Sequence, residues 1–294
     1  MATLRELKGR IGSVASSEKI TGAMKMISSA KMHRAEADLR RLLPFRSQIE
    51  TIIGNLLTAD AEFSSPLTEE REVKRVGIVV LGSDDGLCGG YNINIFKELL
   101  ARFKECREKW GEDVDFTVFT VGRKIHKAVA KLTDPHITEV NDESVSSKSG
   151  ADAIKRFAGM LSERFLSGAV DTVQLLYMNF QSVSRQRLRC EQYLPVDAST
   201  FSSEGVKAVC RPCIFEPDAA TIFRSVLPMF LLSVMQEVFT ENRASEQAAR
   251  IMAMQSANDN AKNLLEQLQL EYNKLRQQSI TTELLDIIGG QVKN

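Results

Sequence analysis

Apolar residues at helical spacing mark the C-terminal part of the chain. From Asp218 to Ile288 there is no proline after Pro228 and no glycine, so nothing in about 60 residues breaks a helix. A helix over about 70 residues would extend ~105 Å, several times the width of a compact domain. Its apolar stripe consists of Leu264, Leu268, Leu275, Ile280, Leu284 and Ile287. The pattern therefore predicts a rod that needs a partner along its length.

A second helical stripe occupies the N-terminus. It begins at Leu4, Leu7, Ile11 and Val14, continues with one slip of phase through Ile20, Met24 and Ile27, and ends with Leu39, Leu42, Ile49, Ile53 and Leu56. Pro44 lies inside this span, so we expect a kink or a local break there. Neither helix has a complete core of its own. We therefore expect residues 1–57 and 218–288 to pair as a long antiparallel coiled coil.

The C-terminal helix changes character between Ala244 and Ala261, where the sequence reads ASEQAARIMAMQSANDNA. Small side chains allow close approach of another helix, and the mixed polar ones keep the remaining faces hydrated. This pattern suits a shaft inside another assembly, but it is also compatible with an ordinary long surface helix.

The middle of the chain, residues 73–217, has the pattern of a Rossmann-like α/β domain with a mostly parallel sheet. Short apolar runs alternate there with helical segments and turn residues. The expected strands are Val76–Leu81, Phe116–Val121, Thr172–Phe180, Arg187–Leu194 and Val206–Phe215. The expected helices are 92–110, 123–132 and 151–166, and residues 141–150 are expected to form a polar loop.

A glycine-rich loop, GSDDGLCGGYN at residues 82–92, follows the first expected strand. Phosphate-binding loops occur at this position, but the spacing matches neither GxGxxG nor GxxxxGK[ST]. Asp84 and Asp85 would also repel a polyphosphate. We therefore expect a tight turn with close helix-sheet packing at Gly86, Gly89 and Gly90, and no bound cofactor.

Composition and cysteine content narrow the possible functions. The 294 residues include 38 acidic and 38 basic side chains, so no overall field recruits nucleic acid or a membrane. The three histidines have no nucleophile or metal-ligand partner at motif spacing, which predicts no catalytic and no metal site. Cys210 and Cys213 have CxxC spacing; ordinary free thiols are favoured over a redox switch.

Polar residues on the two helices remain unexplained by packing. Lys25, Arg250, Gln277, Thr281 and Glu283 lie in or beside the stripes. In an antiparallel pair, residues near 25 meet residues well before 280, so the C-terminal helix should extend alone beyond the N-terminus. Its apolar end, ITTELLDIIGG, would be stable only inside a receiving sleeve.

These motifs resemble the gamma subunits of F-type ATP synthase over the whole chain. The resemblance rests on ITGAMKM at residues 20–26, SDDGLCGGYN at 83–92, SEQAAR at 245–250, YNK at 272–274, RQ at 276–277 and ITTEL at 280–284. It implies a non-catalytic central rotor shaft that couples rotation of the c-ring to the catalytic beta subunits. The implied partners are the ring of alpha and beta subunits, the epsilon subunit and the c-ring.

The resemblance also implies which residues contact the ring and where the protein resides. The implied ring contacts are Met24, Lys25, Arg250, Gln277, Thr281 and Glu283. The start of the chain has no apolar signal core, which favours a bacterial enzyme, peripheral to the cytoplasmic face of the inner membrane. A nucleotide-binding enzyme is disfavoured by the failed loop motifs, whereas a non-catalytic coiled-coil scaffold remains the alternative on pattern alone.

Overall fold

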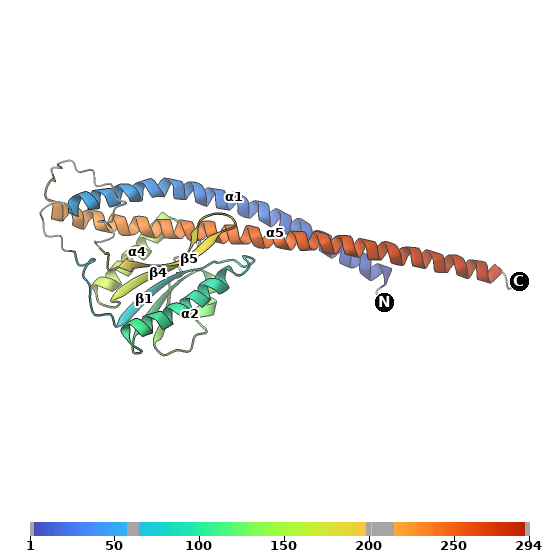
Figure 1. The fold of residues 1–294 in the computed structure, drawn as a ribbon, viewed down its shortest axis with the longest axis horizontal. Coiled ribbons are helices and arrows are strands. Elements are labelled where there is room, and N and C mark those ends of the chain that lie inside the picture. Colours follow the sequence, from blue (N-terminus) through green and yellow to red (C-terminus); the bar gives the residue numbers. More distant parts are fainter. Residues whose placement is uncertain (1–2, 58–64, 198–200, 202–214, 292–294) are drawn as a thin grey trace.

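Two long antiparallel helices and a five-stranded sheet make up the fold (Figure 1). The computed structural model describes residues 3–57, 65–197, 201 and 215–291. Helix α1 spans Leu4–Leu57, and helix α5 spans Ala219–Gln291. They pack side by side along most of α1 and form what we call the shaft. The predicted antiparallel pairing is confirmed.

Helix α1 turns one regular stripe of residues toward α5 and the sheet. The buried or half-buried positions alternate in steps of four and three: Leu7, Ile11, Val14, Glu18, Thr21, Lys25, Ser28, Met32, Ala35, Leu39, Leu42, Arg46, Ile49, Ile53 and Leu56. The predicted slip of phase is wrong, because Ile20 and Ile27 are 59% and 56% exposed. Polar and small side chains occupy this part of the stripe instead, which leaves apolar groups on the outer surface.

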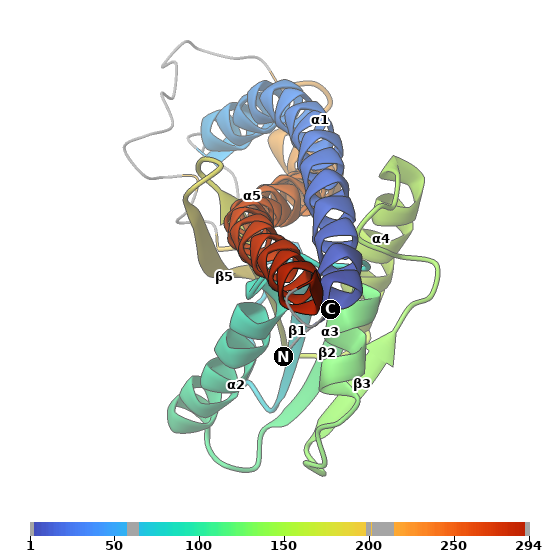
Figure 2. The same cartoon turned by 90° about the vertical axis from the view of Figure 1, so that its right-hand side faces the viewer.

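Both prolines within the long helices are accommodated without a break. Helix α1 continues through Pro44, so the local break expected there is absent, and the helix follows a gentle curve in Figure 2. Helix α5 continues through Pro228 and past Gly289 to Gln291. A long helix can absorb a lost backbone hydrogen bond when tertiary packing holds it on either side of the proline.

The sheet has the strand order β3-β2-β1-β4-β5. Its strands are Arg75–Leu81 (β1), Asp115–Val121 (β2), Ile137–Asn141 (β3), Thr172–Phe180 (β4) and Gln186–Leu194 (β5). The first four are parallel, and β5 adds antiparallel to β4. The connecting helices are Tyr91–Trp110 (α2), Arg123–Val129 (α3) and Ala151–Leu166 (α4). This arrangement confirms the Rossmann-like α/β unit.

Two details of the sheet differ from expectation or cannot be compared with it. Strand β3 was not predicted, because its sequence ITEVN is only half-buried at this edge of the sheet and has no continuous apolar run. Most of the strand predicted at 206–215 lies outside the described residues, as do Cys210 and Cys213.

Alternating side chains of the sheet build two cores. Val76, Ile78 and Val80 of β1 face α2 and α3. Val79 and Leu81 face the opposite side, where α4, the C-terminal part of α1 and the first turns of α5 pack together. Helices thus cover both faces, as a parallel sheet requires.

One stretch of α5 is long and apolar enough, by composition, to cross a membrane. Nevertheless, 56% of this apolar stretch is buried inside the protein. Leu227, Leu231, Met235 and Phe239 lie in the core that α5 shares with the sheet. The apolar character of this stretch is explained by its position as a core helix.

Candidate functional site at the junction of shaft and sheet

The loop between β1 and α2 is held by its own side chains. The backbone N–H of Ser83 donates to Asn92 Oδ1 at 3.0 Å, and Asn92 Nδ2 donates to Ser83 Oγ at 2.8 Å. Gly89 has φ +60°, a backbone conformation that favours glycine, so the predicted turn is confirmed. Leu87 shares a positive φ of 63° and is 62% exposed.

Close packing around this loop occurs at a different glycine from those predicted. A Cβ on Gly82 would lie 2.7 Å from Ile125 Cβ of α3, so only glycine fits there. Among the described residues, neighbours of a Cβ on Gly86 or Gly90 would lie no closer than 3.6 Å. The close approach of α3 to the sheet therefore depends on Gly82, at the end of β1.

The two acidic residues of the loop are compensated by the chain itself. Asp84 is buried, and its carboxylate accepts hydrogen bonds from the Arg123 backbone N–H at 3.2 Å and from Ser147 Oγ at 2.8 Å. Lys148 Nζ donates to Asp85 Oδ2 at 2.6 Å. This hydrogen bond holds the pKa of Asp85 below its usual range. The acidic pair therefore ties the loop to α3 and to the segment before α4.

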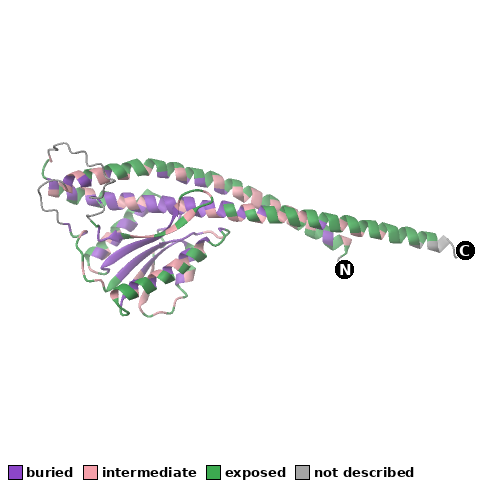
Figure 3. Cartoon of the chain, in the orientation of Figure 1, coloured by how far each residue is buried: buried purple, intermediate pink, exposed green. Residues whose placement is uncertain are grey.

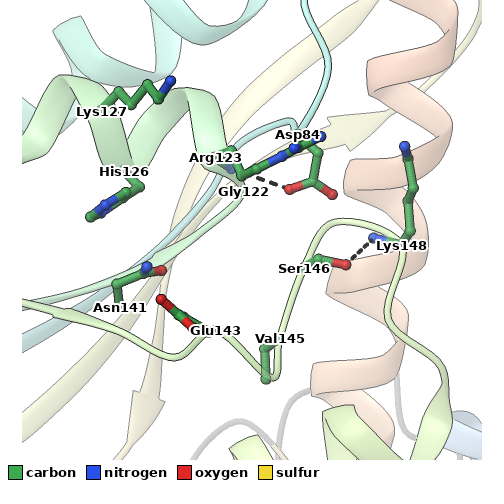
Figure 4. Close-up of a pocket in the computed structure, with 10 residues that line it drawn as sticks. All are labelled: Asp84, Gly122, Arg123, His126, Lys127, Asn141, Glu143, Val145, Ser146 and Lys148. Carbon is green, nitrogen blue, oxygen red and sulfur yellow. Dashed lines mark hydrogen bonds between the residues drawn. The ribbon is translucent and has the colours of Figure 1, made fainter.

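A cavity of about 560 Å³ opens beside this loop at the carboxyl ends of the strands (Figure 4). Its lining consists of Asp84, Gly122, Arg123, His126, Lys127, Asn141, Glu143, Val145, Ser146 and Lys148. The cations among these side chains are offset by Asp84, Glu143 and the neighbouring Asp85. The charges thus nearly balance, which gives a polyphosphate no strong electrostatic attraction.

Asn242 of α5 fills the crevice between the carboxyl ends of β1 and β4. This is where the strand order reverses, and open α/β sheets bind their ligands at that point. Asn242 is 2% exposed. Its Nδ2 donates to the Gly82 carbonyl at 3.2 Å, and its Oδ1 accepts from the Tyr91 hydroxyl at 2.6 Å. The chain's own helix therefore lies at the crevice where open α/β sheets bind ligands.

Further hydrogen bonds join α5 to β4 around Asn242. Ser245 Oγ donates to the Met178 carbonyl at 2.8 Å, and Asn179 Nδ2 donates to both carboxylate oxygens of Glu241 at 2.8 Å. Burial raises the pKa of Tyr91 well above its ordinary value, so its hydroxyl remains a donor at neutral pH. The contact between shaft and sheet is thus polar at its centre, where the side chains of Asn242, Ser245 and Glu241 are hydrogen-bonded.

Arg250 lies at this junction and not on the open surface of the shaft. Its side chain is 8% exposed, and Nη2 lies 2.7 Å from Glu246 Oε1. The guanidinium also donates to the Gly86 carbonyl at 3.4 Å. Burial raises the pKa of Glu246, against the opposing effect of the Arg250 hydrogen bond. Arg250 thus holds the glycine-rich loop against α5.

Lys25 and Met24 lie farther along the shaft, on α1. Lys25 Nζ donates to Gln255 Oε1 of α5, and Gln255 Nε2 in turn donates to Asp259. Asn258 Nδ2 donates to the Glu18 carbonyl at 2.7 Å. Met24 is half-buried. These contacts form a polar layer within the shaft, and they confirm that residues near 25 meet residues well before 280.

Gln277, Thr281 and Glu283 lie on the exposed end of α5. The register of the polar layer places Leu4 opposite about residue 275, so the last 15 or so residues of α5 extend past α1. Figure 3 shows this end exposed on all sides. Its exposed apolar residues include Ile280, Leu284, Leu285, Ile287 and Ile288. About 33 to 42 Å of helix separates these three residues from Gln255, so the six predicted contact residues form separate groups.

Comparison with known proteins identifies the family. A family model described as ATP synthase matches residues 3–292. The ATP synthase gamma chain of Phocaeicola vulgatus is 42% identical over 292 residues, which cover 99% of this chain and 100% of that one. This chain belongs to the ATP synthase gamma chain family. The gamma chain of Cupriavidus necator is 37% identical and covers 99% of both chains.

Chains in solved structures of ATP synthase have the same fold. This chain is similar to one in the Euglena gracilis mitochondrial ATP synthase OSCP/F1/c-ring structure, with a TM-score of 0.66 and 20% identity over 98% of this chain and 93% of that one. A chain of the central stalk and c-ring structure from Tetrahymena thermophila has a TM-score of 0.58 and 21% identity, covering 81% and 99% of the two chains. The resemblance inferred from the motifs is confirmed, and the gamma chain is a non-catalytic subunit of the synthase.

Sequence reasoning missed the gamma-chain residues that join the shaft to the sheet. Tyr91 belongs to the glycine-rich motif, but Asn242 lies 151 positions away and in no motif, so no spacing connects the two residues. The one available signal was an asparagine that follows the strongly apolar stretch of α5 closely. Gln255 and Asn258 were equally hidden within the polar run from Ala244 to Ala261.

Proposed function

We propose that this gamma-family chain, the central stalk subunit of an ATP synthase, turns as a shaft within a ring of alpha and beta subunits. The observation that carries the proposal is the unpaired end of α5. Its exposed Ile280, Leu284 and Ile287 would be poorly soluble as a free helix, and a surrounding sleeve would bury them. The sheet unit at the other end would join the epsilon subunit and the c-ring.

The shaft can act on catalytic sites without doing chemistry itself. Its faces differ: α1 carries exposed Ile20, Met26 and Ile27, whereas the other side presents the sheet and the glycine-rich loop. Each beta subunit of a surrounding ring would therefore contact a different surface. Contacts that favour one conformation of a beta subunit shift its equilibrium, and rotation passes that bias to the next subunit.

The proposed ring contacts fall into two zones. Gln277, Thr281 and Glu283 at the tip are exposed and available to a partner. In the second zone, Met24 and Lys25 lie beside the exposed Met26 and Ile27. Arg250 is buried, so we propose that it acts through the loop it holds, which presents the exposed Leu87 to the ring.

The charge on the surface of α1 also supports a surrounding ring at this part of the shaft. Between residues 5 and 34, α1 exposes a set of cationic side chains: Arg5, Lys8, Arg10, Lys19, Lys31 and Arg34. The exposed acidic residue in this span is Glu6. A ring surface with acidic groups would complement this part of the shaft and align it on entry.

The proposed location is the cytoplasmic face of a bacterial inner membrane. The relatives from Phocaeicola vulgatus and Cupriavidus necator, both with full-length matches, support a bacterial setting. Attachment to the membrane would come through the c-ring, since the apolar stretch of α5 is a core helix.

Reconstitution tests this function. Purified alpha and beta subunits from the same source are assayed for ATP hydrolysis with and without the chain, alongside gel filtration. We expect one large complex with one copy of the chain per ring and sustained turnover. Separate elution with unchanged turnover would contradict the rotor and favour a non-catalytic coiled-coil scaffold.

A further inference from the structure

Asn242 lies at the centre of a polar cluster that adjoins the apolar contact between α5 and the sheet. On α5, Leu231, Met235, Val238 and Phe239 precede it in the core. Apolar contacts stabilise the docking of α5, but they are non-directional and tolerate small rotations of a helix. Hydrogen bonds depend on angle as well as distance. The hydrogen bonds of Asn242 therefore restrict motions that the apolar core permits.

Those hydrogen bonds come from three different elements. The Tyr91 hydroxyl at the start of α2 donates to Asn242 Oδ1 at 2.6 Å and lies 3.1 Å from the Asn242 carbonyl oxygen. The Gly82 carbonyl after β1 accepts from Asn242 Nδ2, and the Met178 N–H of β4 donates to Oδ1 at 3.4 Å. Partners at the start of α2, just after β1 and on β4 fix both the axial position and the rotation of α5 at this point.

We propose that Asn242 and Tyr91 are positioning residues that set the angle of the shaft relative to the sheet unit. This inference rests on the proposed function, in which the sheet unit is the foot of the rotor. The angle of the foot then determines which beta subunit meets a given face of the shaft. Without the network, shaft angles spread around the mean, so the tip meets each beta subunit over a wider range of foot angles.

Two variants and one matched control address this role. Tyr91→Phe removes the donor and keeps the ring, and Asn242→Ala removes the centre of the network. Tyr193→Phe is the control, because its buried hydroxyl also donates to α5 but reaches only the Leu231 carbonyl, at 3.1 Å. All three lose one buried polar group or more, so general loosening affects the control as well.

The first measurement reports the shaft angle in the full chain. Spin-labelled amino acids are placed genetically at Lys104 on α2 and Lys262 on α5, both exposed, and pulsed dipolar spectroscopy gives the distance distribution between them. For Tyr91→Phe we expect the displaced population to rise about fivefold, the factor for one lost hydrogen bond. Tyr193→Phe should retain the wild-type distribution.

The second measurement uses the complete synthase in sealed vesicles. We expect Tyr91→Phe to lower the rate of ATP-driven proton pumping about twofold, since each beta subunit meets the shaft over a wider range of foot angles. Wild-type pumping and an unchanged distance distribution in both variants would overturn the proposal. An equal effect of Tyr193→Phe would also overturn it. If the wild-type chain fails to join or activate the ring, the proposed function itself fails, whatever the distance distributions show.

Discussion

Arg46 of α1 and Glu237 of α5 form an ion pair across the shaft, with Nη1 and Oε2 2.7 Å apart. Arg46 also bonds Glu50 at 2.8 Å, one helical turn away on α1. The Glu237 side chain is only 11% exposed. Burial alone would lower the pKa of Arg46, but hydrogen bonds to Glu237 and Glu50 raise it, so the guanidinium remains charged.

Removing one partner of this pair should weaken the shaft. We expect Arg46→Ala to lower the free energy of unfolding by about 2 kcal/mol, because it leaves Glu237 buried without its cation. Chemical denaturation of the full chain measures this. Arg40→Ala is the control, since its ion pair with Glu36 is largely exposed and should contribute less than about 1 kcal/mol. Equal losses in the two variants would contradict the argument.

Glycine substitutions should have opposite effects at two positions. Gly82→Ala places a Cβ 2.7 Å from Ile125 Cβ, and we expect it to cost about 3 kcal/mol through overpacking. Gly12→Ala on α1 meets no atom within 4 Å among the described residues, and it should stabilise the helix by about 1 kcal/mol. Thermal unfolding of both variants measures these two changes in stability. A tolerated Gly82→Ala would show that α3 can move away from β1.

Stability should depend on the titration of Glu241. Burial raises the pKa of Glu241 to about 6 from 4.5. A raised carboxyl pKa means that the folded state binds the proton more tightly than the unfolded state does. The protonated Glu241 therefore stabilises the folded state fully below the unfolded pKa, and this stabilisation is lost as pH rises through about 6. We expect Glu241→Gln to gain up to about 2 kcal/mol relative to wild type between pH 5 and pH 7.5.

Denaturation curves of the wild type, Glu241→Gln and the exposed control Glu266→Gln across this pH range test the prediction. The difference between wild type and Glu241→Gln isolates this group from other carboxylates, such as Glu246. A difference that stays constant with pH would contradict the assignment.

Arg250 and Gln277 should behave differently, because Gln277 is proposed to contact the ring directly and Arg250 to act through the glycine-rich loop. Gln277→Ala, on the exposed tip, should reduce coupled ATP synthesis and leave the thermal midpoint unchanged. Arg250→Ala should also lower the stability, by about 3 kcal/mol, because Glu246 would remain buried and unpaired. The double change of Arg250 and Glu246 to alanine should recover part of that loss.

Differential scanning calorimetry and proton-driven ATP synthesis separate these effects. A normal synthesis rate with Gln277→Ala would remove this residue from the proposed contacts. An unchanged midpoint with Arg250→Ala would show that water reaches Glu246 when the guanidinium is absent.

The amino-acid sequence alone determined the periodic elements of this protein. Two long helices, their antiparallel pairing and the run of β1, β2 and β4 follow from local spacing, because a helical stripe or an apolar strand repeats within a few residues. The family also followed from contiguous motifs, such as SEQAAR at 245–250. Local pattern failed where it was ambiguous: Ile20 and Ile27 match a helical stripe but face outward.

Only the tertiary structure decided which polar groups meet. Lys25 and Gln255 are 230 positions apart, and Tyr91 and Asn242 are 151 apart. Whether a polar side chain is exposed or sits in a buried network depends on the relative placement of whole elements, which no spacing rule records. Arg250 shows the consequence: its motif gives no sign that the fold encloses it between Glu246 and the glycine-rich loop. Periodicity is a property of neighbours along the chain, and a hydrogen-bonded junction is a property of the packed molecule.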